Sequence, residues 1–122
     1  REALARGAGE ALLARDGRVL EGSTGSLVWR DAGRWCTEGT GEVLPSVTLA
    51  ALRDGGVAIG LGSLRAATLT AGAVEGLVLV SALRLAVAIR EVDGRALSTA
   101  ASLAAAAEWR ERLLSRHAKG EA

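Results

Sequence analysis

Arg18-Val19-Leu20-Glu21-Gly22-Ser23-Thr24-Gly25-Ser26-Leu27-Val28-Trp29 is the stretch of sequence that decides the fold. An apolar run ends there on one carboxylate, Glu21, and a turn of small Gly, Ser and Thr residues follows at once. Because glycine lets a backbone approach a neighbouring group closely, the arrangement favours a carboxylate that faces a ligand. The alternative is an ordinary glutamate at a strand end, which we would prefer if no other signal were present.

Around this stretch the pattern predicts short antiparallel strands. Asp16-Gly17 lies between two apolar runs, and such a pair is typical of a two-residue hairpin because both turn positions favour positive φ. The strands that we expect are residues 10–15, 18–21, 26–30 and 33–37. With a turn at residues 31–33, the four would form an antiparallel meander. Residues 1–8 instead have the pattern of a helix end, stopped near Gly7 and Gly9.

The middle of the chain mixes helix and strand signals. Pro45-Ser46 predicts a helix over residues 47–54, with Ser46 as its N-cap and Gly55-Gly56 at its end. Residues 76–80 form a continuous apolar run, typical of a strand buried on both faces. The further elements that we expect are a strand at 57–59, a helix within 65–75, and a strand at 85–90 before a turn at 93–94.

The last predicted element is a helix that is capped by Ser98 or Thr99 and runs to about His117. Its expected apolar stripe is Leu103, Ala106, Trp109, Leu113 and Leu114, opposite Glu108, Arg112 and Arg116. With no internal repeat and no interdomain linker visible, the chain reads as one domain. The order of elements predicts a mixed α/β fold, a largely antiparallel sheet with flanking helices.

Composition excludes several classes of function. Nearly half of the 122 residues are apolar, which is enough for one folded core. A net charge of +1 and the lack of Phe and Tyr give no basis for a nucleic-acid partner. The longest apolar run, residues 76–89, contains Arg84 and is too short to span a membrane. A single cysteine, Cys36, fits a reducing compartment and reads as a core thiol, so we expect a cytoplasmic protein.

A metal site is not predicted, because one Cys and one His cannot supply a set of ligands. His117 reads as a solvated residue near the C-terminal end of a helix, where a positive charge is favourable. Gly60-Leu61-Gly62 lacks the strand-to-helix context of a dinucleotide-binding loop.

Three segments together resemble the class IV (fold-type IV) aminotransferases, enzymes that depend on pyridoxal 5′-phosphate. Residues 19–27 resemble the family's glutamate-glycine-serine signature, and Leu44-Pro45-Ser46-Val47-Thr48 resembles its leucine-proline-glycine-isoleucine-threonine turn. Residues 76–94 are similar to its late strand, phosphate loop and following strand. The resemblance covers roughly residues 5–95 and implies the larger, C-terminal domain of the D-amino-acid-aminotransferase-like fold, over residues 1–122. Aminodeoxychorismate lyase has the closest motifs, with branched-chain and D-amino-acid transaminases as relatives.

The resemblance also implies where the cofactor's phosphate binds. Ser46, Val47 and Thr48 would hold it through backbone N–H groups at a helix start, where unpaired donors and the helix dipole favour an anion. Ser81 and Ala82 would add a second contact from the loop after the buried strand. Taken on its own, Ser46 is better explained by a plain N-cap, whereas Ser81 is equally well explained by a simple strand exit.

Glu21 would hydrogen-bond the pyridine nitrogen of the cofactor and keep it protonated, again as the resemblance implies. The chain departs from the family's usual pattern at three positions. Ser26 stands where many members carry Asn, Ser46 where Gly is usual, and Ala88 where proline is usual. These departures bear on the substrate rather than on the fold.

The family's chemistry needs a lysine that forms a Schiff base with the cofactor, upstream of the glutamate by more residues than this chain has. The only lysine, Lys119, lies in the polar tail and is not its counterpart. No catalytic residue is therefore assigned within the chain. We expect these residues to be the C-terminal part of a longer enzyme, inactive alone.

Two hypotheses of function follow from the resemblance. The first is a pyridoxal-phosphate enzyme, either 4-amino-4-deoxychorismate lyase, which removes pyruvate to leave 4-aminobenzoate for folate biosynthesis, or an amino-acid transaminase. Its partners would be an aminodeoxychorismate or amino-acid substrate and a second copy in a homodimer. The second is a non-catalytic scaffold or partner domain that retains the fold without the lysine.

Overall fold

The computed structural model describes most of the chain. The backbone is described over residues 2–7, 10–15, 18–22, 25–39, 47–81, 85–92, 95–97 and 99–118. Side chains are described over residues 25–39, 48–69, 71–81, 85–92, 96–97 and 99–115.

A four-stranded antiparallel sheet, sheet A, forms from the N-terminal part of the chain and one later strand. Its order is β1 (Glu2–Gly7), β2 (Glu10–Arg15), β3 (Arg18–Gly22) and β7 (Leu64–Arg65). The pairing of β2 with β3, in which Arg15 lies opposite Arg18, confirms the predicted hairpin. The helix end predicted over residues 1–8 is wrong, because Glu2–Gly7 pairs with β2 as a strand. Pairing with a neighbouring strand outweighs the helical preference of this Ala-rich segment.

The second sheet, sheet B, has five strands. Its order is β6 (Gly60–Gly62), β5 (Arg34–Glu38), β4 (Ser26–Asp31), β8 (Gly76–Ser81) and β9 (Leu85–Ala88), and only the β5–β6 pair is parallel. The turn between β4 and β5 has positive φ at Ala32 (50°) and Gly33 (75°), as a tight hairpin requires. The prediction that the first four expected strands form one antiparallel meander is wrong, because β3 belongs to sheet A and β4 to sheet B.

Several later elements also differ in extent from the predictions. Residues 57–59 form no strand, and pairing with β5 begins only at Gly60. The helix expected within 65–75 is the single short α2 (Ala66–Thr70), which is followed by Gly72 at a φ of 70°. After β9, the pair β10 (Glu91–Val92) and β11 (Arg95–Ala96) flanks the predicted turn at 93–94, which itself lies outside the described residues.

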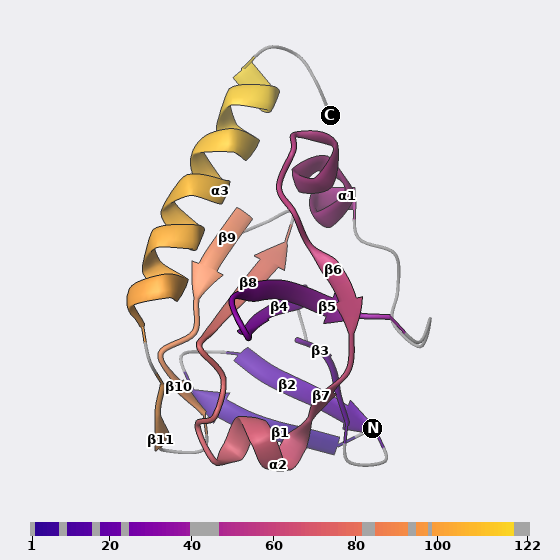
Figure 1. Cartoon of the computed structure of the whole chain (residues 1–122), viewed down its shortest axis with the longest axis vertical. Helices are drawn as coiled ribbons and strands as arrows, with labels where there is room; N and C mark the ends of the chain where they lie inside the picture. The colour runs from indigo at the N-terminus through magenta and orange to yellow at the C-terminus, as the bar shows by residue number, and fades with distance from the viewer. Residues whose placement is uncertain are drawn as a thin grey trace.

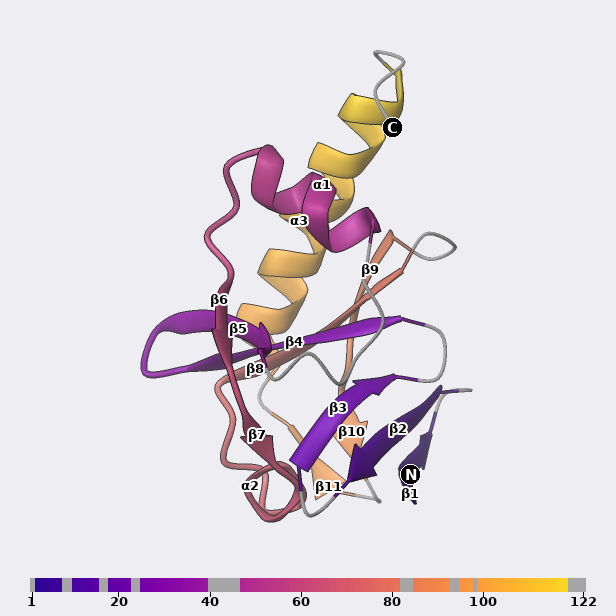
Figure 2. The ribbon, with the colours of Figure 1, turned by 90° about the vertical axis from the view of Figure 1, so that its right-hand side faces the viewer.

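Two helices cover one face of sheet B. Helix α1 (Val47–Asp54) ends before Gly55-Gly56, as predicted. The Gly55 N–H donates to the Ala51 carbonyl oxygen, and Gly56 has a φ of 94°. The longer α3 (Ala100–Ala118) follows directly after Thr99. Figure 1 shows both helices beside sheet B, and Figure 2 shows sheet A on its other side.

The stripe predicted for α3 is right at Ala106, Trp109 and Leu113, which are buried. It is wrong at Leu103 and Leu114, which are 44% and 52% exposed. The buried face is centred instead on Ser102, Ala105, Ala106, Trp109 and Leu113. Because each helical residue turns by about 100°, Leu103 and Leu114 lie to one side of this face.

Strand β8 supplies the centre of both cores, and all six of its residues are buried. Leu77 and Leu79 belong to a cluster on the side of sheet A, together with Leu27, Trp29 and Leu64. Val78 and Val80 pack on the opposite face with α1 and α3, around Val28, Leu52 and Trp109. Burial of each such side chain stabilises the fold by about 1.5–3 kcal/mol. The predicted strand buried on both faces is confirmed. No helix among the described residues could span a membrane.

Candidate functional site

One edge of sheet B brings together the segments that the sequence singled out. Ser26, at the start of β4, pairs with Val80 near the end of β8. That end is Ser81, which is only 4% exposed. Strand β5 runs antiparallel to β4 and ends at the same edge.

Gly25 fixes how closely the turn lies against β8. A Cβ atom at this position would come within 2.4 Å of the Val80 carbonyl oxygen and 2.8 Å of the Ser81 Cβ. Only glycine fits such an approach without a shift of the backbone. Gly25, directly before β4, is therefore in contact with the end of β8, which the sequence alone did not reveal.

Glu21 itself lies in β3, where its backbone is opposite Leu13 of β2. It is the penultimate residue of the strand, next to Gly22. Its side chain lies outside the described residues, as do residues 23 and 24. The proposed contact of Glu21 with a pyridine nitrogen therefore stays a prediction.

The helix start expected to bind phosphate is present. Val47 is the first residue of α1, and the side chain of Thr48 is 8% exposed. Helix α1 contacts β8, since Leu49 and Leu52 pack in the same cluster as Val80. Ser46 and Ala82 lie outside the described residues. The roles predicted for Val47, Thr48 and Ser81 stay predictions, although a helix start and a buried hydroxyl are groups that suit an anion.

A buried carboxylate that sequence reasoning missed lies at the same edge. Glu38, the last residue of β5, is 4% exposed and pairs with Gly62 of β6. Next to it, the Thr37 hydroxyl donates to the Leu27 carbonyl oxygen at 2.8 Å and ties β5 to β4. The strand predicted over residues 33–37 ended one residue before Glu38. No local signal marks Glu38 as buried, because its burial depends on the pairing of β5 with β6.

The described residues hold no group of three or more His, Cys, Asp or Glu that could bind a metal ion. Cys36 is half-buried and packs against the cluster between the two sheets. Its thiol also lies near Gly62, where an added Cβ would be 3.8 Å from the Sγ. This placement agrees with the prediction of a core thiol.

Comparison with known proteins identifies relatives of the same fold. The chain is similar to a fold IV-transaminase, CpuTA1, from Curtobacterium pusillum, with 30% identity and a TM-score of 0.77, over 95% of this chain and 40% of that one. It is also similar to the PLP-bound form of a hypothetical aminotransferase from Mycobacterium tuberculosis, with 28% identity and a TM-score of 0.71, over 90% and 40% of the two chains.

A protein from Legionella pneumophila provisionally named 4-amino-4-deoxychorismate lyase shares the fold, at 16% identity and a TM-score of 0.62, over 75% of this chain and 35% of that one. The sequence matches no curated protein. The chain spans about 40% of the length of the first two structures.

A family model, amino-transferase class IV, matches residues 1–92. This range includes β3, α1 and β8, the three elements that form the candidate site. The match covers most of the chain, and the fold agrees with that of the two transaminase structures. The chain therefore belongs to the class IV aminotransferase family.

Proposed function

We propose that this chain is the cofactor-binding domain of a pyridoxal-phosphate-dependent transaminase or lyase. The observation that carries the proposal is the contact of Gly25 with Val80 and Ser81. It joins the turn that follows a candidate ring-binding carboxylate to a candidate phosphate-binding strand end. The PLP-bound relative of the same fold supports the choice of cofactor.

The residues present fit the two ends of this cofactor. A phosphate needs N–H and hydroxyl donors, and the start of α1 with Ser81 offers both. The protonated ring nitrogen needs a carboxylate, and Glu21 would supply it. Gly25 is required by the same arrangement, because a side chain there would push the turn away from Ser81.

Each residue has a separate role in the proposed site. Glu21 holds the proton on the ring nitrogen, and the backbone N–H groups of Val47 and Thr48, with Ser46, bind the phosphate. Ser81 and Ala82 would add a second contact to the phosphate. When bound, pyridoxal phosphate supplies an electron sink for the α-carbon of an amino substrate. We assign no Schiff-base lysine to these residues, and propose that it lies outside them.

The activity of the whole protein is a finer proposal. Elimination of pyruvate from aminodeoxychorismate and transamination of an amino acid would use the same cofactor contacts. The resemblance of the chain as a whole favours the lyase, whereas the relatives of higher identity favour the transaminase, and the two activities share every residue named here. We propose a homodimer as its assembly. A scaffold that had lost the chemistry would not need the phosphate contacts, so cofactor binding separates the two classes.

The N–H of Val47 provides the sharpest test. Proline is well tolerated at the first position of a helix, where its missing N–H breaks no bond within the helix. Val47→Pro should therefore leave α1 intact and remove one phosphate donor. A charge-assisted hydrogen bond contributes about 1.5–3 kcal/mol, so we expect the Kd for pyridoxal phosphate to rise about tenfold or more. The Kd for pyridoxal, which has no phosphate, should change little.

Ala100→Pro is the matched control, because Ala100 is the first residue of α3. Both affinities are measured by absorbance titration of the purified full-length protein. An equal effect of the two proline variants, or an unchanged preference for the phosphorylated form, would place the phosphate elsewhere. A wild-type protein that binds neither form would favour the scaffold.

A further inference from the structure

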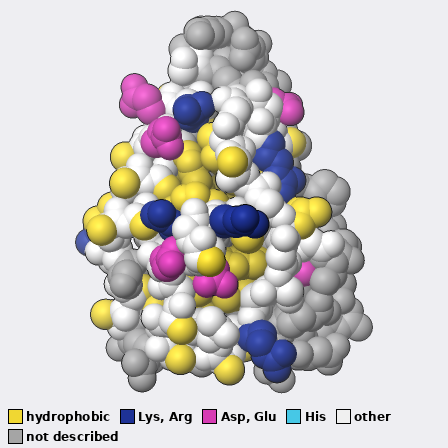
Figure 3. Space-filling model, in the orientation of Figure 1, with side chains coloured by type: hydrophobic (Ala, Val, Ile, Leu, Met, Phe, Trp, Pro, Cys, Tyr) yellow, Lys and Arg dark blue, Asp and Glu magenta, His cyan; other side chains and the backbone are white. Residues whose placement is uncertain are grey.

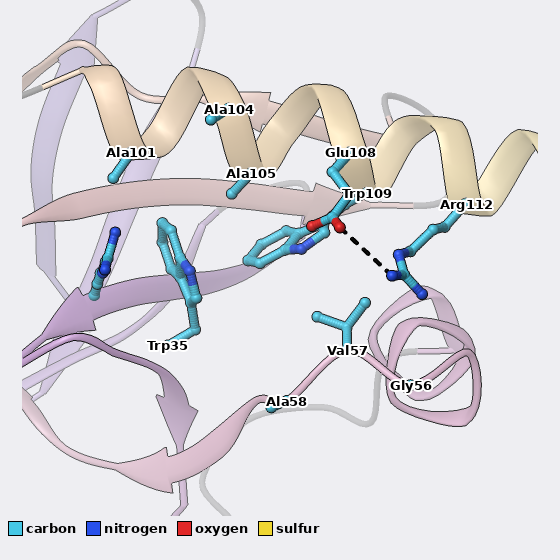
Figure 4. Close-up of a pocket in the computed structure, with 11 residues that line it drawn as sticks. Trp35, Gly56, Val57, Ala58, Ala101, Ala104, Ala105, Glu108, Trp109 and Arg112 are labelled. Atoms are coloured by element: carbon cyan, nitrogen blue, oxygen red, sulfur yellow. Dashed lines mark hydrogen bonds and ion pairs between the residues drawn. The ribbon is translucent and has the colours of Figure 1, made fainter.

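A cavity of about 400 Å³ lies on the helix side of sheet B, away from the edge that carries Ser81. Its walls come from α3, from the start of β5 and from the loop that follows α1 (Figure 4). In Figure 3 apolar side chains gather in a hollow on this face, with basic and acidic side chains at its margin. This volume is within the range of about 300–1,000 Å³ that is common for small-molecule sites.

Aromatic side chains form the inner wall. Trp35 and Trp109 meet edge to face, with ring centroids 5.0 Å apart and an angle of 72° between the rings. Trp109 is 2% exposed, and Trp35 is half-buried, so that part of its indole borders the open space. A flat ring placed there would gain the same kind of aromatic contact that the two indoles make with each other.

Small side chains keep the space open. Ala101, Ala104 and Ala105 line it from α3, and Ala58 lies across from them. Ala104 and Ala58 are exposed, so a larger residue at either position would extend into the cavity rather than into the core.

Two arginines, Arg30 and Arg112, line the cavity and differ in how their guanidinium groups are paired. Arg112 is occupied: its Nη1 donates to the Gly55 carbonyl oxygen at 2.7 Å, and its Nη2 to Glu108 at 3.4 Å. Arg30 forms an ion pair with Glu75 through its Nε, at 3.4 Å, and the two side chains are 38% and 48% exposed. This Nε atom is itself buried and makes no hydrogen bond within the described residues. Because the rest of the Arg30 side chain is partly exposed, its terminal nitrogens can meet a second anion while Nε keeps Glu75.

We propose that this cavity is a second binding site, which takes a small planar aromatic carboxylate. The ring lies against Trp35 and the alanines of α3, and the carboxylate pairs with the guanidinium of Arg30, whose fork suits two carboxylate oxygens. The site does not depend on the proposed cofactor. It lies at the opposite end of α1, since Gly56 lines the cavity while Val47 begins the helix.

Isothermal titration of the full-length protein with indole-3-acetate tests the proposal. Indole-3-acetamide, which is neutral, and cyclohexylacetate, which has no aromatic ring, should each bind about tenfold more weakly or worse. Ala104→Leu, which fills the cavity, and Arg30→Gln, which removes the cation, should each weaken indole-3-acetate by at least about tenfold, or about 1.4 kcal/mol.

The matched controls lie on α3 outside the cavity. Ala107→Leu adds the same side chain at an exposed position, and Arg110→Gln removes the same charge. Both should bind within about twofold of the wild type, a change below about 0.4 kcal/mol. If Ala104→Leu lowers the thermal stability, Ala58→Leu fills the cavity from the opposite wall. Absence of binding at millimolar indole-3-acetate, or equal losses in the cavity and control variants, would overturn the proposal.

Discussion

Gly25 is the residue on which the geometry of the candidate site most depends. It is not required by a positive φ, because the structure gives no such value for it. What excludes a side chain is the Val80 carbonyl oxygen, which belongs to the backbone of a fully buried strand and cannot move away cheaply. A single hydrogen atom in place of a methyl group therefore decides whether two parts of the site can meet.

Gly25→Ala should destabilise the protein by about 1–3 kcal/mol, the usual cost of forcing extra volume into a packed position. It should also weaken pyridoxal-phosphate binding, because the turn must move away from Ser81. Urea unfolding and cofactor titration measure the two effects. Gly55→Ala is the control, since its Cβ would lie 3.4 Å from its nearest neighbour. A Gly25→Ala protein as stable as the control would show that the turn yields without cost.

Helix α3 illustrates how an element is attached as well as packed. Ser102 is fully buried, and its hydroxyl accepts a hydrogen bond from the Leu77 N–H at 2.8 Å. The same hydroxyl lies 3.0 Å from the position that a Cβ on Gly76 would occupy. The helix is thus held at the first residues of β8 by a polar contact, and along the rest of its length by Trp109 and the alanines.

Ser102→Ala should cost about 1–3 kcal/mol, because it leaves the buried N–H of Leu77 without an acceptor. Ser115→Ala makes the same change at an exposed position of α3 and should alter the free energy of unfolding by less than about 0.5 kcal/mol. Chemical denaturation compares the two variants. Equal stabilities would mean that water or another group replaces the lost acceptor.

The sequence predicted a helix or strand correctly where a single local signal was enough to identify it. Asp16-Gly17 predicted a hairpin, and the unbroken apolar run from Gly76 predicted a strand buried on both faces. It failed at Leu103 and Leu114, because both are apolar and near the stripe, and only the packing of α3 decides which flank is covered. A short apolar segment such as residues 57–59 also has the pattern of a strand, and only the pairing with β5, which begins at Gly60, shows that it is not one.

At the scale of the whole molecule, sheet B is covered on both faces, so its central strand should dominate stability. Leu79→Ala removes a side chain that is 2% exposed and should cost about 2–5 kcal/mol. Leu61→Ala is the matched control on edge strand β6, where the side chain is 67% exposed, and should change little. Thermal or urea unfolding measures both. A small loss of unfolding free energy in Leu79→Ala would show that the surrounding core relaxes to fill the space left by the deleted side chain.

The sequence predicted only part of the candidate site, because it shows local motifs but not which distant segments come together. Motifs name residue types in order along a chain, so Val47, Thr48 and Ser81 could be proposed without a structure. Contacts between segments that are far apart in the chain cannot be recognised from the order of residues. Neither the approach of Gly25 to Val80 nor the burial of Glu38 follows from local pattern, since each depends on which strands become neighbours within sheet B.

The order of strands in sheet B has a kinetic consequence. The hairpin β4–β5 closes a short loop, whereas β4 and β8 pair across more than forty residues, from Ser26 to Val80. Closing the longer loop loses more chain entropy before any contact compensates for it. The local hairpins should therefore form early in refolding, and the Ser26–Val80 register should lock late. The two halves of the proposed cofactor site would become adjacent only at that last step.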